Sequence, residues 1–178
     1  MLEFERGGVL DALRTGGGMS DANGNERDTS GAVIRPPIAW ALAVLVGLAL
    51  DWLYPLRFLA LEMPAGALGG ILFLAGLALL VWAATSFRRA GTQIPTTQPT
   101  TAIVDQGPYR FTRNPIYLGM FFGLIGLAVA VNSLWLLVLL LPFYVVIRYG
   151  VVAREEAYLD RKFGEVYRAY RARVGRWL

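Results

Sequence analysis

The sequence predicts an all-α integral membrane protein: a helical bundle with four membrane-spanning helices and a C-terminal amphipathic helix on the cytoplasmic side. Of its 178 residues, 56% are hydrophobic and 17% are charged, which is more apolar surface than one soluble core of this size can bury. Long apolar runs recur along the chain, and the run from Asn114 to Ile147 carries no charge. The lipid bilayer is therefore the expected solvent for much of the chain.

The N-terminal region differs from the rest in composition. Residues 1–31 are polar, mixed in charge and rich in glycine, so they are expected to form a disordered cytoplasmic tail. The tail has no apolar stretch of the kind found in a cleavable signal peptide. Met19 is an alternative start to Met1. Residues 32–178 are expected to form one membrane domain.

The first two spans are predicted at about 37–54 and 65–84. The prolines before the first span suit a helix start, and Trp52 and Tyr54 at its end suit the headgroup level. Asp51 is expected to reach the membrane surface, and a buried functional carboxylate is the alternative. In the second span, Gly66-x-x-x-Gly70 predicts a face for close helix packing.

The third and fourth spans are predicted at about 116–131 and 134–152, as a helical hairpin that turns at Asn132-Ser133. Pro142 is expected to kink the second arm. A close-packed face is expected on the first arm, at Gly119-x-x-x-Gly123 and Gly126.

The last segment, 154–173, has the periodicity of a surface helix. Its apolar residues recur at intervals of three and four: Leu159, Phe163, Val166, Tyr167 and Tyr170. Arginines gather in this segment and between the second and third spans, so the positive-inside rule puts both termini and the polar stretch 85–115 in the cytoplasm. The expected location is a bacterial inner membrane.

The composition also limits the chemistry. The chain has no cysteine and no histidine, which excludes zinc hydrolases, thiolate metal sites and nucleophilic enzymes that need a histidine base, and no metal site is expected. The net charge of +4 favours anionic lipid headgroups, and no nucleic-acid partner is expected.

Two polar segments carry groups that a scaffold would not need. The first, 105–119, forces a turn at Gly107-Pro108 and opens a helix at Pro115, whose unpaired backbone N–H groups would point toward the loop. The second contains Glu155 and Glu156, which lie about 100° apart around a helix and so cannot share one task. One of them would face the bundle and the other would pair with arginine.

These segments resemble a known family. The run Gly-Pro-Tyr-Arg-Phe-Thr-Arg-Asn-Pro-Ile-Tyr-Leu-Gly at 107–119 is followed by an apolar hairpin and by Glu-Glu-x-x-Leu-x-x-x-Phe-Gly-x-x-Tyr-x-x-Tyr at 155–170. Together they resemble the isoprenylcysteine carboxyl methyltransferase family, which is related to the phospholipid N-methyltransferases. The resemblance covers about 87–178 and implies a membrane methyltransferase domain that uses S-adenosylmethionine.

The resemblance also implies roles for individual residues. Arg113 and Glu155 would be catalytic. Val151 stands where the family's eukaryotic members carry a substrate-binding arginine, so that contact would be missing or supplied by Arg148 or Arg154. Asn114 replaces the family's usual histidine and cannot act as a base. The implied cofactor-binding residues are Thr101, Ala102, Ile103, Val104, Tyr109, Asn114, Pro115, Ile116, Tyr117 and Glu155.

The expected acceptor is lipid-like or isoprenoid-like, and it would enter from the bilayer. A carboxylate acceptor is favoured because it needs no general base, whereas an amine must lose a proton in a chain without histidine. Two alternatives stay open: an NADPH-dependent sterol reductase-like protein, and a non-catalytic membrane scaffold. The sequence leaves the oligomeric state open.

Overall fold

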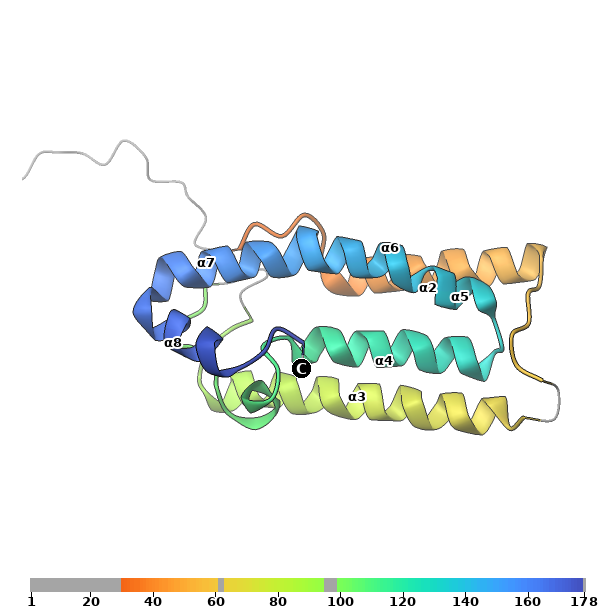
Figure 1. The fold of residues 1–178 in the computed structure, drawn as a ribbon, viewed down its shortest axis with the longest axis horizontal. Helices are drawn as coiled ribbons and strands as arrows, with labels where there is room; N and C mark the ends of the chain where they lie inside the picture. Colours follow the sequence, from red (N-terminus) through yellow and green to blue (C-terminus); the bar gives the residue numbers. More distant parts are fainter. Residues whose placement is uncertain (1–29, 61–62, 95–98, 178) are drawn as a thin grey trace, which may run out of the picture.

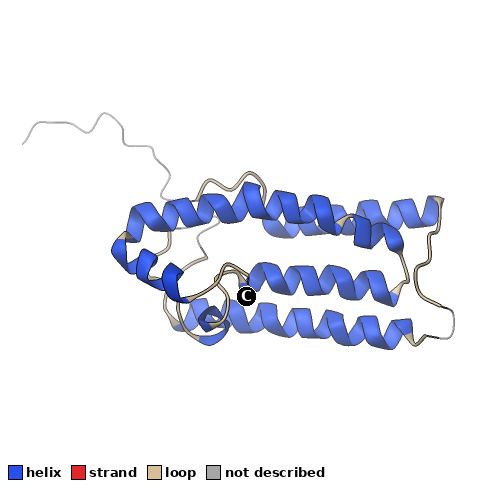
Figure 2. Ribbon diagram, in the orientation of Figure 1, coloured by secondary structure: helices blue, strands red, loops and turns tan. Residues whose placement is uncertain are grey.

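The computed structural model describes residues 30–60, 63–94 and 99–177, and the regular structure in these ranges is helical throughout (Figure 2). The helical membrane bundle predicted from the sequence is confirmed. Most of the predicted tail, residues 1–29, lies outside the described residues. The elements are α2 (Pro36–Leu53), α3 (Ala65–Arg89), the 3-10 turn η1 (Gly107–Arg110), α4 (Pro115–Ala130), α5 (Leu134–Val138), α6 (Leu140–Val145), the π-helical turn η2 (Val146–Val152), α7 (Ala153–Phe163) and α8 (Glu165–Arg173).

Three helical stretches of the described chain are long and apolar enough to cross a membrane, namely 36–53, 65–89 and 134–163. The expected third span, α4, is shorter, with 16 residues. It packs against α3 along nearly its whole length, so the two helices lie side by side (Figure 1).

Glycines allow α3 and α4 to pack this closely, but the pair on α3 differs from the predicted one. A Cβ on Gly76 would lie 2.6 Å from the Gly119 carbonyl oxygen, and a Cβ on Gly126 would lie 2.7 Å from the Gly69 oxygen. Nothing lies within 4 Å of a Cβ on Gly66 or on Gly70, so the predicted Gly66-x-x-x-Gly70 packing face is wrong. The contact repeats every seven residues because α3 and α4 run antiparallel with closely aligned axes over two helical turns.

The second arm of the hairpin is one long interrupted rod. Pro142 has no N–H to donate to the Val138 carbonyl, which is where α5 ends. Beyond η2 the rod continues without a break into α7, so the predicted division between a span at 134–152 and a surface helix at 154–173 is wrong. The division falls at Gly164, whose φ of 50° ends α7.

The break at Gly164 also changes the predicted apolar stripe. Because the helix axis changes direction there, the spacing of three and four residues does not carry through from Phe163 to α8. Tyr167 and Tyr170 are buried, whereas Val166 is 65% exposed. Val166 therefore lies off the side of α8 that packs against the bundle.

The hairpin brings the two polar segments to one end of the bundle. α4 runs away from that end, the turn at Asn132 reverses the chain, and the rod 134–163 returns it (Figure 1). The end of α3, the start of α4 and α7 therefore meet at what we call the site end. The opposite end, with the loop 54–60 and the turn 131–133, is the far end.

Candidate functional site

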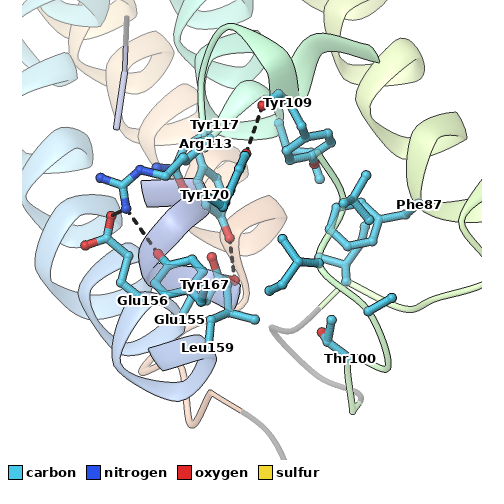
Figure 3. Close-up of a pocket in the computed structure, with 16 residues that line it drawn as sticks. Phe87, Thr100, Tyr109, Arg113, Tyr117, Glu155, Glu156, Leu159, Tyr167 and Tyr170 are labelled. Carbon is cyan, nitrogen blue, oxygen red and sulfur yellow. Dashed lines mark hydrogen bonds and ion pairs between the residues drawn. The ribbon is translucent and has the colours of Figure 1, made fainter. Parts of the chain in front are cut away.

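A pocket lies at the site end, between the end of α3, the segment 99–104, η1, the start of α4, and helices α7 and α8 (Figure 3). Both polar segments singled out in the sequence contribute to its wall. The pocket is lined by Phe87, Ile94, Thr100, Ala102, Ile103, Val104, Tyr109, Arg113, Asn114, Ile116, Tyr117, Glu155, Glu156, Leu159, Tyr167 and Tyr170.

The Tyr117 hydroxyl donates a hydrogen bond of 2.7 Å to the Glu155 carboxylate, and both side chains are buried in the pocket wall. Tyr117 lies in the first turn of α4 and Glu155 in the first turn of α7. The two residues are 38 positions apart in the chain. A buried carboxylate is costly unless it is hydrogen-bonded, and this bond meets part of that need.

Two further tyrosines extend the wall. Tyr109 is buried edge-on against Phe87, with ring centroids 5.2 Å apart, and its backbone carbonyl accepts a 2.9 Å hydrogen bond from the Tyr170 hydroxyl. Burial, followed by the nearby Glu155 carboxylate, raises the pKa of Tyr109. Burial raises the pKa of Tyr170 as well. Both phenols therefore stay protonated at neutral pH.

The adjacent glutamates have separate partners, as the helical spacing predicts. Glu156 also lines the pocket, where Arg113 pairs with it at 2.9 Å and Arg176 binds it through two contacts of 2.9 and 2.7 Å. Arg113 also donates to the Tyr167 hydroxyl at 3.1 Å. Both glutamates therefore line the pocket, but Glu155 bonds to Tyr117 while Glu156 pairs with arginines, of which Figure 3 shows Arg113.

Asn114 stands directly before α4 and is buried. Its side-chain amide donates a 2.9 Å hydrogen bond to the backbone carbonyl of Arg176, and its own backbone N–H donates to the Thr112 hydroxyl. The amide thus joins the start of α4 to the segment after α8. A neutral amide suits this task, since it keeps its N–H donors at any pH.

The segment 99–104 is fastened to the wall from two sides. The backbone N–H of Thr100 donates to the Tyr158 hydroxyl on α7 at 3.3 Å. The backbone N–H of Thr101 donates to the Thr92 hydroxyl at 2.8 Å. The segment has no regular secondary structure, and these bonds hold its residues Ala102, Ile103 and Val104 at the pocket.

The structure brings most of the sequence-predicted site residues together, with four exceptions. Thr101 is exposed, Pro115 is buried, and neither residue lines the pocket. Arg148 stacks over the Tyr149 ring at 5.1 Å. Arg154 is exposed and donates to the backbone carbonyl of Gly31, away from the pocket. Neither arginine lines the pocket, so the predicted substrate contacts of Arg148 and Arg154 have no support in this arrangement.

Six lining residues were not among the predicted site residues, although the last three lie in the motif at 155–170: Phe87, Ile94, Thr100, Leu159, Tyr167 and Tyr170. Leu159, Tyr167 and Tyr170 were assigned to an apolar stripe, and that stripe could have marked them as a pocket wall, because it lies next to the polar segment that begins at Arg154. Arg176 was missed because it lies beyond the last predicted helix.

The site combines a buried carboxylate, phenol donors and an aromatic and aliphatic wall. The described residues contain no group of three or more histidine, cysteine, aspartate or glutamate side chains that could hold a metal ion. A pocket with these groups suits a ligand that carries hydroxyl or cationic groups on a partly apolar body.

A membrane-embedded helical bundle with such a pocket at one end is the class of protein that fold and site define. Within that class, the sequence profile of the phospholipid methyltransferase family matches residues 64–166, more than half of the chain. The chain therefore belongs to this family of membrane methyltransferases, which includes isoprenylcysteine carboxyl methyltransferase-like proteins. The family resemblance noted from the sequence is confirmed.

Among curated proteins, the chain is similar to an uncharacterized protein of Haemophilus influenzae. The two are 52% identical over 48 residues, which is 26% of this chain and 73% of that protein. No solved structure matches the chain.

Proposed function

We propose that this protein is an S-adenosylmethionine-dependent methyltransferase that acts on a lipid-like acceptor at the cytoplasmic face of the membrane. The observation that carries the proposal is the Tyr117–Glu155 hydrogen bond of 2.7 Å inside the pocket. It joins the two motifs that resemble methyltransferase signatures, and it places a buried carboxylate where a polar ligand can reach it. Membership of the phospholipid methyltransferase family supports the same reaction class.

The residues present fit this cofactor. Glu155 would accept hydrogen bonds from its polar end, and the rings of Tyr109 and Tyr167 offer faces that attract a sulfonium cation. The backbone of Ala102, Ile103 and Val104 would border its less polar part. When bound, S-adenosylmethionine supplies an activated methyl group.

The pocket has to widen to take a ligand of this size. The cavity encloses about 60 Å³, whereas pockets for drug-sized ligands measure roughly 300–1,000 Å³. The segment 99–104 is the wall best able to move, because it has no regular secondary structure and is held by isolated hydrogen bonds. We expect it to shift when the ligand enters.

The protein's own contribution is alignment in a dry site. Orientation of two reactants can supply about 7–11 kcal/mol of barrier lowering in favourable cases. A carboxylate acceptor fits this site best, because it arrives as an anion and needs no proton acceptor. For an amine acceptor, the proton would have to pass to Glu155, to Tyr117 or to water, since the chain has no histidine.

The position of the pocket supports a lipid-like acceptor. The wall that contains Ile116 and Tyr117 continues directly into apolar helix α4, and Glu155 continues from the apolar rod 134–152. An acceptor with a long apolar chain would enter sideways from the bilayer, while the cofactor would enter from the cytosol. The arginine distribution supports a cytoplasmic position for this end of the bundle and for both termini.

Titration calorimetry with S-adenosylhomocysteine tests the cofactor assignment. The detergent-purified protein should bind it, and NADPH should neither bind nor compete. Absence of binding by S-adenosylhomocysteine together with tight binding by NADPH would support the reductase alternative. No binding of either ligand would favour the scaffold.

The acceptor is tested in lipid extracts of cells with and without the gene. Mass spectrometry should find lipids whose mass is higher by one methylene, about 14 Da, only when the gene is present. Methyl esters among the shifted species would support a carboxylate acceptor, and N-methyl species would contradict it.

A further inference from the structure

The segment Val174–Trp177, which we call the strap, leaves the end of α8 and runs back into the bundle beside the start of α4 (Figure 1). Val174 adopts an extended backbone and packs with Tyr167 and Tyr170. The Trp177 ring lies between α4 and α6, with its centroid 5.9 Å from Phe121 and 6.0 Å from Tyr144. The strap is therefore anchored at both of its ends.

Between these anchors, the strap backbone accepts three hydrogen bonds from the segment before α4. The Gly175 carbonyl accepts from the backbone N–H of Arg113 at 2.9 Å. The Arg176 carbonyl accepts from the Thr112 hydroxyl at 3.1 Å and from the Asn114 amide at 2.9 Å. The strap thus holds three successive residues of the motif at 107–119, namely Thr112, Arg113 and Asn114.

The Arg176 side chain reaches the opposite wall. Its guanidinium binds both oxygens of Glu156 on α7, at 2.9 and 2.7 Å, and Glu156 directly follows Glu155. A two-point arginine–carboxylate contact fixes orientation as well as distance. Arg176 therefore connects, within one residue, the wall that carries Tyr117 to the wall that carries Glu155.

We propose that Arg176 is a positioning residue of the methyl-transfer site, which sets the distance between the α4 wall and the α7 wall. The inference rests on the proposed function. Arg113 and Arg176 together balance the charges of Glu155 and Glu156, so loss of Arg176 leaves one net negative charge at the pocket. That charge opposes a carboxylate acceptor as well as loosening the wall.

The test compares Arg176→Ala with a matched control, Arg173→Ala, in the full-length purified protein. Arg173 is an exposed arginine on α8, and its nearest acidic partner, Asp105, is 4.0 Å away. Arg176→Ala should weaken S-adenosylhomocysteine binding roughly tenfold, the loss expected for one charged hydrogen-bonded contact. Arg176→Lys should recover part of that loss, and Arg173→Ala should bind like the wild type.

A second variant separates positioning from general stability. In Arg176→Gln combined with Glu156→Gln, two amides can pair without an unbalanced charge, so binding should recover relative to Arg176→Gln alone. Wild-type binding by Arg176→Ala would overturn the proposal. So would a loss of binding that merely follows the loss of thermal stability and is not reversed in the double variant.

Hydrogen–deuterium exchange gives a readout that does not depend on the cofactor. Arg176→Ala should speed exchange in the peptide covering 112–117, because the backbone N–H of Arg113 loses its fixed acceptor. Unchanged exchange there overturns the proposal even if the wild type binds no S-adenosylhomocysteine. Failure of the wild type to bind, with faster exchange in the variant, contradicts the proposed function and leaves the positioning role supported.

Discussion

The two ends of the bundle use similar residues for different purposes. At the far end, Asp51 pairs with Arg57 at 3.1 Å, and Arg57 also donates to the Val131 carbonyl at 2.9 Å. Asn132 completes this network by accepting from two backbone N–H groups and donating to the Leu59 carbonyl. At the site end, an acid, an arginine and an asparagine again join loops to helices.

The difference lies in what surrounds the acids. The far-end network fastens the loop 54–60 to the turn 131–133, and half of the Arg57 side chain is exposed. At the site end the two acids have different partners. Glu156 pairs with Arg113 and so fastens the chain, whereas Glu155 bonds to Tyr117 in the pocket wall. A polar cluster becomes a candidate site when one of its buried charged groups faces a cavity rather than another segment of the chain. For Asp51, the structure favours a fastening role over a functional carboxylate.

The strongest test of this difference exchanges carboxyl for amide at each end. Glu155→Gln keeps the side-chain shape but removes the charge, so S-adenosylhomocysteine affinity should fall by about 10–100-fold, the range for a charged hydrogen bond. Asp51→Asn should leave that affinity unchanged, because its end of the bundle does not touch the pocket. Titration calorimetry measures both. Equal affinity in Glu155→Gln and the wild type would remove the assigned role of Glu155.

The second test uses the glycines that bring α3 and α4 together. Gly119→Ala near the site and Gly126→Ala near the far end should each cost about 1–3 kcal/mol of stability, because the new methyl group meets a carbonyl oxygen of α3. Thermal unfolding in detergent measures this loss. Gly119→Ala should also weaken ligand binding, since it displaces the helix turn next to Tyr117.

The matched control is Gly70→Ala, where a Cβ meets nothing within 4 Å. This variant should be as stable as the wild type or slightly more so, because alanine favours helices by roughly 0.5–1 kcal/mol over glycine. A loss of stability in Gly70→Ala as large as in Gly126→Ala would contradict the packing described here.

A smaller effect is expected from Tyr117→Phe. The variant keeps the ring in the wall and removes the hydroxyl that donates to Glu155. Affinity for S-adenosylhomocysteine should fall about fivefold, corresponding to roughly 1 kcal/mol for one hydrogen bond. An affinity change larger than that of Glu155→Gln would reverse the assigned ranking of the two residues.

The smallest effect is expected from Arg57→Gln at the far end. The Arg57–Asp51 pair is partly exposed, and such pairs contribute about 0.2–1 kcal/mol. The melting temperature should drop slightly, and ligand affinity should not change. Weaker binding of S-adenosylhomocysteine by this variant would show that the two ends are coupled.

Sequence reasoning predicted the candidate site from two short polar motifs, one at the start of α4 and one within the rod 134–163, and both line the pocket. The helix at Pro115 and the turn at Asn132 follow from local rules for proline and asparagine, and the structure has both. The hairpin alone brings the two motifs to the same end of the bundle, whereas the contact between Tyr117 and Glu155 also depends on how the helices are rotated. The sequence could not show that Gly70 lies away from α4. Glycine spacing shows that a close helix contact is possible, but not which face of the helix the partner occupies.

By itself, the sequence determined the membrane bundle, the hairpin and the two polar motifs, because apolar length and helix-start chemistry are local properties of the chain. Tertiary structure alone decided that Glu155 rather than Glu156 bonds to Tyr117, that Gly164 divides the last helices, and that Arg176 holds the site together. These outcomes depend on how the helices are rotated about their axes and where the chain returns after α8. Both are set by packing between distant segments.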